Sequence, residues 1–174
     1  MKNVFTTKRL CRAGIIAALY VVLTYAFAPF AFGPLQIRPA EALCILPLFF
    51  FEAVPALWIG CMLSNLSSPF LVYDVLIGSL ATLLAALCTY FIGRIFKKDF
   101  PRLALGGIFP VVFNALIIPF IIVVLCGDLG GKSSMLSAYE FYAVCFLLTQ
   151  SVWVYGLGTP LYFLFQRRID RITR

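Results

Sequence analysis

The sequence predicts an all-α integral membrane protein with six transmembrane helices and both termini in the cytoplasm. Three observations support this fold class. The 174-residue chain is 63% hydrophobic and only 12% charged, whereas charged residues make up about a quarter of a typical soluble domain. Its mean hydropathy is +1.01. Its basic residues form short clusters at the ends of apolar segments, which is the pattern of topology signals in membrane proteins.

The composition also limits the domain count and the chemistry. No linker or composition shift divides the chain, so we expect a single domain over residues 1–174. The net charge of +7 reflects the basic clusters and does not indicate nucleic-acid binding. The chain has no histidine, which excludes an imidazole base or ligand. Its six cysteines are scattered singly through apolar segments, so we expect buried thiols, no disulfide, no metal site and no cofactor.

The first predicted span covers residues 13–32 and follows Lys2, Lys8, Arg9 and Arg12, which place the N-terminus in the cytoplasm. Its length of about 20 residues suits a membrane crossing and exceeds the core of a secretory signal. Ala13 and Ala17 are four residues apart and form a stripe of small side chains that allows another helix to approach closely. The sequence leaves open whether this stripe packs within the bundle or docks a separate subunit.

Three further spans are predicted over residues 75–92, 103–125 and 138–165. The positive-inside rule places the basic loop 94–102 and the basic C-terminus in the cytoplasm. One helix over 41–65 would put that loop outside, so we predict a cytoplasmic turn at 51–53 and two short spans, 41–51 and 54–66. Pro55 suits the first turn of the new helix, and Glu52 is favourable near its positive end. Span 41–51 covers only about 17 Å, so it must be short, deformable and shielded by neighbours.

With this topology, the polar residues of the spans converge on the outer half of the bundle. A charged side chain at membrane depth costs at least about 2.5 kcal/mol and therefore requires a reason. We predict a ligand pocket that opens outward. Its candidate substrate-binding residues are Arg38, Glu41, Asn65, Asp74, Asn114, Glu140, Gln150 and Trp153.

Several of these residues also have structural interpretations. Asp74 at a helix start can act as a cap, and Arg38 can pair with Glu41. Glu140 can be solvated at the interface. The amides of Asn114 and Gln150 can hydrogen-bond between helices, and Trp153 can be a packing or belt residue.

Carboxylates, amides and aromatic rings together favour a small, flat, donor-rich ligand, including a cationic one. A carboxylate accepts two parallel donors from a guanine-like edge, and an amide donates to a carbonyl oxygen. Aromatic rings bind such a molecule by its faces. A phosphate or carboxylate ligand fits less well, because Arg38 and Lys132 are the only basic residues predicted on the outer side.

Four segments of the chain read FGPLQIRPAEAL at 32–43, GCMLSNL at 60–66, DVLIGSLATLLAA at 74–86 and PVVFNALII at 110–118. In their order and spacing these segments resemble the QueT family, the substrate-binding S components of energy-coupling factor (ECF) transporters. The resemblance covers most of the chain and is looser in the C-terminal third. It implies a six-helix subunit of the plasma membrane that binds a queuosine precursor, such as the 7-deazaguanine preQ1, from outside the cell.

The resemblance also implies partners. Such subunits associate with a transmembrane coupling protein and two cytoplasmic ATPases, and they dock through an AxxxA motif that Ala13 and Ala17 match. The sequence has no GxxxxGK[ST] motif, so ATP hydrolysis would come from those partners and not from this chain.

Three alternatives remain open. The same architecture can carry another small vitamin-like molecule. A stand-alone secondary carrier is disfavoured because no inverted repeat is visible. An intramembrane enzyme is disfavoured because Glu41 and Asp74, a conceivable acid/base pair, have no nucleophile to serve.

Overall fold

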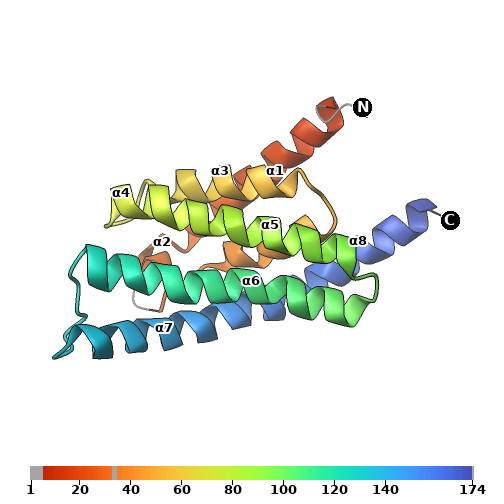
Figure 1. Ribbon diagram of the computed structural model, residues 1–174. Coiled ribbons are helices and arrows are strands. Elements are labelled where there is room, and N and C mark those ends of the chain that lie inside the picture. Colours follow the sequence, from red (N-terminus) through yellow and green to blue (C-terminus); the bar gives the residue numbers. More distant parts are fainter. Residues whose placement is uncertain (1–5, 33–34, 174) are drawn as a thin grey trace.

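The computed structural model describes residues 6–32 and 35–173 and is 83% helical, with no strand in those ranges. The chain folds as a bundle of helices that run roughly along one axis (Figure 1). In chain order the helices are α1 (Thr7–Ala26), α2 (Ala28–Ala31), η1 (Pro39–Leu48), α3 (Ala53–Asn65), α4 (Leu71–Tyr73), η2 (Asp74–Gly78), α5 (Ser79–Ile95), α6 (Asp99–Pro119), η3 (Phe120–Leu125), α7 (Met135–Ser151), η4 (Val152–Leu157) and α8 (Gly158–Thr173).

Four continuous helical runs in the described residues are long and apolar enough to cross a membrane. They are Thr7–Ala26, Leu71–Ile95, Asp99–Leu125 and Met135–Arg168. The helices η1 and α3 are apolar but shorter, and they follow one another between the first and second of these runs. Each of the six predicted spans overlaps one of these helical segments.

The observed helices extend beyond several predicted boundaries. Helix α1 begins at Thr7 rather than at residue 13, and α6 begins at Asp99 rather than at 103. The predictions followed apolar composition alone, whereas lysine and arginine are good helix formers and continue a helix beyond its apolar part. Residues 33 and 34, in the predicted loop after the first span, lie outside the described residues.

The predicted short second span is the 3-10 helix η1. Proline begins it at Pro39, and Pro47 near its end lacks an N–H group, which disfavours a regular α-helix. A 3-10 helix rises about 2.0 Å per residue, so its ten residues span about 20 Å. All ten residues are buried. The expectation of a short helix shielded by its neighbours is confirmed.

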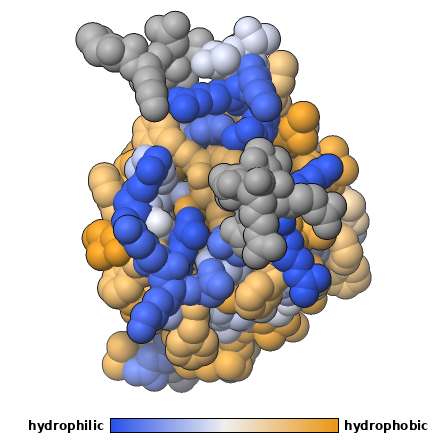
Figure 2. Space-filling model, turned by 90° about the vertical axis from the view of Figure 1, so that its right-hand side faces the viewer, coloured by the Kyte–Doolittle hydropathy of each residue, from blue (hydrophilic) through white to orange (hydrophobic). Residues whose placement is uncertain are grey.

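One end of the bundle collects the basic residues. The start of α1, the η1–α3 turn, the α5–α6 turn and the end of α8 lie together at the right of Figure 1, whereas α4 and the start of α7 lie at the opposite end. Figure 2 views the first of these ends and shows hydrophilic side chains across it. We call it the basic end; its described basic residues are Lys8, Arg9, Arg12, Arg94, Lys97, Lys98, Arg102, Arg167 and Arg168.

The predicted turn around Glu52 is present at the basic end. Arg12 of α1 donates to Glu52 Oε1 over 2.6 Å. The Arg12 guanidinium carbon also lies 4.2 Å from the centre of the Phe50 ring. These contacts fix the η1–α3 turn beside the start of α1. At the other end, Arg38 just before η1 hydrogen-bonds to Asn65 at the end of α3, so η1 and α3 run in opposite directions along the bundle.

Candidate functional site

Glu41 is the centre of a hydrogen-bond network inside the bundle. It lies in the first turn of η1 and is 1% exposed. Tyr20 of α1 donates its hydroxyl to Glu41 Oε1 over 2.7 Å. Cys44 and Asn114 both donate to Glu41 Oε2 over 3.3 Å. A carboxylate in an apolar bundle is therefore met by neutral donors from α1, η1 and α6.

Arg38 lies just before η1 and is also buried. Its Nη2 donates to Asn65 Oδ1 over 2.7 Å, and its Nε donates to the Ala31 carbonyl over 3.2 Å. The guanidinium carbon lies 4.9 Å from the centre of the Phe32 ring, within cation–π range. The alternative in which Arg38 pairs with Glu41 is therefore wrong, because its hydrogen bonds go to an amide and a backbone carbonyl.

Asn65 and Asp74 connect the end of α3 to η2. The Asn65 side chain donates to the Asp74 carbonyl over 2.9 Å. Ser68, in the loop before α4, donates to Asp74 Oδ2 and accepts from the Phe70 N–H. Asp74 Oδ1 is buried and has no hydrogen-bond partner. The carboxylate thus orders the α3–α4 loop and retains a free acceptor.

These hydrogen bonds form two neighbouring groups, one that joins Glu41 to Tyr20 and Asn114 and one that joins Arg38, Asn65 and Asp74. Five parts of the chain supply their residues: α1, the start of η1, α3, η2 and α6. We call the two groups together the buried polar cluster. Each member is at most 5% exposed. A buried polar group without a partner costs about 1 to 3 kcal/mol, so these hydrogen bonds offset the cost of burying the side chains. Its members are Tyr20, Arg38, Glu41, Asn65, Asp74 and Asn114.

The last three candidates occupy different environments. Gln150 of α7 is completely buried, and neither its amide nitrogen nor its amide oxygen has a hydrogen-bond partner in the described structure. Trp153 is partly buried in η4, which packs against η1. Glu140 is exposed, and no hydrogen bond or ion pair among the described residues joins it to the buried polar cluster. Its solvated interpretation therefore fits the structure better.

The sequence prediction missed one member of the buried polar cluster, Tyr20, and two thiols that hydrogen-bond to its members. Tyr20 lies seven residues after Ala13, and therefore on nearly the same face of α1, but tyrosine is common in apolar helices and gave no separate signal. Cys44 and Cys61 are buried thiols as expected, and both hydrogen-bond to members of the cluster. The expectation of burial is wrong for the other four cysteines, because Cys11 is exposed and Cys88, Cys126 and Cys145 are only partly buried. Cys44 donates to Glu41, and Cys61 Sγ accepts from Asn65 over 3.4 Å and from Thr82 over 3.2 Å.

The small-residue stripe of α1 packs within the bundle and also borders an open groove. Ala13 and Ala17 are partly buried against the core between α1 and α3. A side-chain carbon at Gly60 of α3 would lie 3.1 Å from the Ala17 carbonyl oxygen, which shows how closely the helices approach. The same stripe borders an open groove of about 510 Å³. Its lining comes from α1 and from the start of α3: Arg9, Leu10, Ala13, Gly14, Ala17, Phe51, Glu52, Pro55, Ala56 and Ile59.

Among the described residues, no group of three or more His, Cys, Asp or Glu side chains is arranged to hold a metal ion. The chemistry of the buried polar cluster is hydrogen bonding. It offers carboxylate oxygens, amide groups and one guanidinium, and Gln150 adds an amide with no partner of its own. These groups match the requirements of a small polar molecule inside an apolar protein.

Apolar helices of spanning length that enclose a buried polar site define a multi-pass membrane protein of the transporter type. A model of the QueT transporter family matches residues 10–167. This chain belongs to that family. It is also 38% identical over 88 residues to "Queuosine precursor transporter QueT" of Lactococcus lactis subsp. cremoris (strain MG1363). That alignment spans 49% of this chain and about half, 52%, of the relative. No solved structure matches the chain.

Proposed function

We propose that this chain is the substrate-binding S component of an ECF-type importer in the plasma membrane and that it captures a queuosine precursor from outside the cell. The observation that carries this proposal is the buried polar cluster together with the unpartnered groups of Asp74 and Gln150. Membrane interiors tolerate such groups where they have partners or a function. A ligand that hydrogen-bonds to these groups accounts for their position.

The proposed topology has six crossings with both termini in the cytoplasm. The start of α1 and the end of α8 lie at the same end of the bundle, which requires an even number of crossings (Figure 1). The four long helical runs together with η1 and α3 give six. Nine described basic residues lie at that end, and basic residues are enriched on the cytoplasmic side. Asn65 and Asp74 would then lie toward the outside.

The ligand chemistry favours a 7-deazaguanine. The Asn114 contact to Glu41 Oε2 is 3.3 Å long, beyond the usual range for an N–H···O bond. The other donor to Oε2 is the thiol of Cys44, which is a weak donor, so a ligand donor can replace both. Asp74 Oδ1 accepts a further donor, and the Gln150 amide both donates and accepts. The purine-like edge and the aminomethyl cation of preQ1 supply matching groups. Trp153 in η4 is the proposed stacking residue.

The proposed partner surface is the groove beside Ala13 and Ala17. Its lining is mostly apolar and small, which suits close approach by a helix of a coupling subunit in lipid. ATP hydrolysis would come from two partner ATPases, because the sequence contains no GxxxxGK[ST] motif.

Reconstitution tests the S-component mechanism directly. In proteoliposomes that contain only this chain, we expect preQ1 to bind without ATP and not to accumulate inside. Accumulation should appear when a coupling subunit and its ATPases are added with ATP. Accumulation by the chain alone would instead identify a stand-alone secondary carrier.

Labelling tests the topology. A cysteine at Glu52, in a chain whose Cys11 and Cys126 are replaced by serine, should react with a membrane-impermeant maleimide only from the cytoplasmic side. Reaction only from outside would contradict the six-crossing arrangement.

A further inference from the structure

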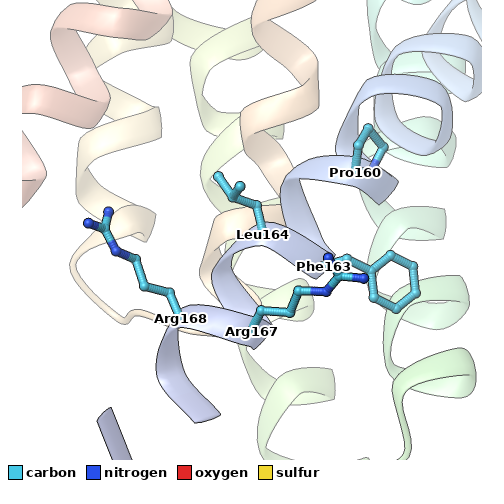
Figure 3. Close-up of a pocket in the computed structure, with 5 residues that line it drawn as sticks. All are labelled: Pro160, Phe163, Leu164, Arg167 and Arg168. Carbon is cyan, nitrogen blue, oxygen red and sulfur yellow. The ribbon is translucent and has the colours of Figure 1, made fainter. Parts of the chain in front are cut away.

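A pocket at the end of α8 lies outside the site described above. Its volume is about 560 Å³, and it is lined by Pro160, Phe163, Leu164, Arg167 and Arg168 (Figure 3). Figure 3 shows Arg167 extending toward the side of the pocket where Phe163 lies, and Arg168 extending to the other side. The pocket therefore combines an apolar floor with two cations.

Neither arginine is neutralised by the described part of the protein. Arg167 and Arg168 are exposed, and neither forms an ion pair with a described residue. Arg12 at the same end pairs with Glu52, and Arg102 donates to the Leu48 carbonyl. Two guanidinium groups that border one pocket and have no described carboxylate paired with them can bind an anion, and arginine binds phosphate through parallel N–H···O bonds.

An apolar groove continues from this pocket along the bundle. It lies between α6 and the η4–α8 helix, has a volume of about 420 Å³ and shares Phe163 with the pocket. Leu103, Ala104, Tyr155 and Thr159 line it away from the basic end. The Tyr155 hydroxyl donates to the Ala104 carbonyl over 2.6 Å, so Tyr155 is already engaged within the wall of the groove, and the hydroxyl of Thr159 is the other polar group of this inner part.

Asp99, the one carboxylate in the groove lining, is engaged by another residue. The Tyr162 hydroxyl donates to Asp99 Oδ1 over 2.8 Å. Asp99 begins α6, whereas the arginines lie four and five residues beyond Phe163 toward the end of α8. The order along the surface is therefore cations, then aromatic and apolar side chains, then a mostly apolar groove.

We infer that this surface binds one anionic phospholipid, with its phosphate at Arg167 and Arg168 and an acyl chain in the groove between α6 and η4–α8. The charge order matches that of a lipid in the leaflet at the basic end: anion at the surface, hydrocarbon inward. Phe100, at 85% exposed, and Leu164, at 64%, face this same lipid environment. Basic pockets between membrane helices are known to hold anionic head groups.

The test measures lipid retention by the full-length chain. Native mass spectrometry in detergent would follow the binding of phosphatidylglycerol and of phosphatidylcholine to the purified protein. We expect phosphatidylglycerol to bind in preference, with one tight site. Arg167→Gln combined with Arg168→Gln should weaken that site by about 30-fold. Equal binding of the two lipids would overturn the inference.

A matched control distinguishes a specific lipid-binding site from general electrostatic attraction of anionic lipids to the basic end. Arg94→Gln combined with Lys97→Gln removes the same charge at the same end but outside the pocket, and it should leave the tight site unchanged. An equal loss in both double variants would show only a surface-charge effect and would overturn the inference.

A third variant tests the groove. Ala104→Trp should fill it and weaken phosphatidylglycerol binding, while soluble glycerophosphoglycerol, which has no acyl chain, should bind the variant and the parent chain equally. If soluble glycerophosphoglycerol binds the parent chain as tightly as the lipid does, the site binds a free phosphodiester rather than a membrane lipid, and the acyl-chain assignment is wrong. An unchanged helical content and elution volume would verify that each variant is folded.

Discussion

The buried polar cluster and the basic end use the same residue types in opposite ways. Arg38 is 3% exposed, and the acceptors of its hydrogen bonds come from Asn65 and Ala31. Arg167 and Arg168 are exposed and have no described ion-pair partner. Water can solvate a charge at the end of the bundle, whereas a polar group inside the bundle requires a protein partner or a ligand. An unpartnered polar atom inside the bundle is therefore stronger evidence for a ligand site than an unpartnered charge at its end.

The largest expected effect is on uptake, and it distinguishes docking of a coupling subunit in the groove beside Ala17 from substrate binding at the buried polar cluster. Ala17→Trp places an indole in the groove between α1 and α3. We expect uptake in cells to stop, because a helix of the coupling subunit can no longer approach, while substrate binding to the purified variant stays nearly intact. Leu19→Trp, at an exposed position on another face of α1, is the control and should transport normally. Normal uptake by Ala17→Trp would show that this groove is not the docking surface.

The next effect tests the cluster itself. Glu41→Gln removes the charge that Tyr20, Cys44 and Asn114 surround, and it should weaken substrate binding by about 1 to 3 kcal/mol because a charge-assisted bond to the ligand is lost. Isothermal titration calorimetry would measure this change. The matched control is Glu140→Gln, an exposed carboxylate on α7, whose affinity should equal that of the parent chain. Equal affinities for all three proteins would give Glu41 a purely structural role.

Helix η1 connects the buried polar cluster, at Glu41, to the basic end, at Leu48, and its packing can be tested at Gly93. A side-chain carbon at Gly93 of α5 would lie 2.6 Å from the Leu48 carbonyl oxygen at the end of η1. Gly93→Ala should therefore shift η1 and lower the stability by about 1 to 3 kcal/mol, the usual effect of overpacking. Thermal unfolding in detergent would detect it. Gly156→Ala, where nothing lies within 4 Å of the added carbon, should not be destabilised in this way.

The smallest expected effect tests the unpartnered amide of Gln150. Gln150→Leu removes two buried polar atoms that lack hydrogen bonds. The melting temperature of the ligand-free protein should stay equal or rise, whereas substrate affinity should fall by about 1 kcal/mol for one lost hydrogen bond. A lower melting temperature with unchanged affinity would mean that Gln150 supports the fold and does not contact the ligand.

Local rules predicted the elements that depend on composition and charge order. The short helix after Arg38 and the turn at Glu52 followed from the placement of basic clusters, and both are present. The polar residues at the ends of the short helices, Arg38, Asn65 and Asp74, also come together as the convergence argument required. These features depend on the position of a residue along the chain and not on the rotation of a helix about its axis.

Features that depend on helix rotation and side-chain choice were not predictable. Glu140 and Gln150 are ten residues apart, which places them about 80° apart around an α-helix, and only the packed bundle shows that the glutamine faces inward. The Tyr20–Glu41 bond joins two helices whose relative register the sequence does not contain. Similarly, the sequence was compatible with an Arg38–Glu41 ion pair and with no such pair. The structure distinguishes the two, because the Arg38 guanidinium donates to Asn65.

Direct binding to the isolated chain tests the central claim. Purified protein would be titrated with preQ1, preQ0, queuine and guanine, without partner subunits or ATP. The account predicts saturable binding of one molecule per chain, with preQ1 preferred because its cationic aminomethyl group meets a carboxylate. Absence of saturable binding for all four molecules would contradict the assignment of the buried polar cluster as a queuosine-precursor site.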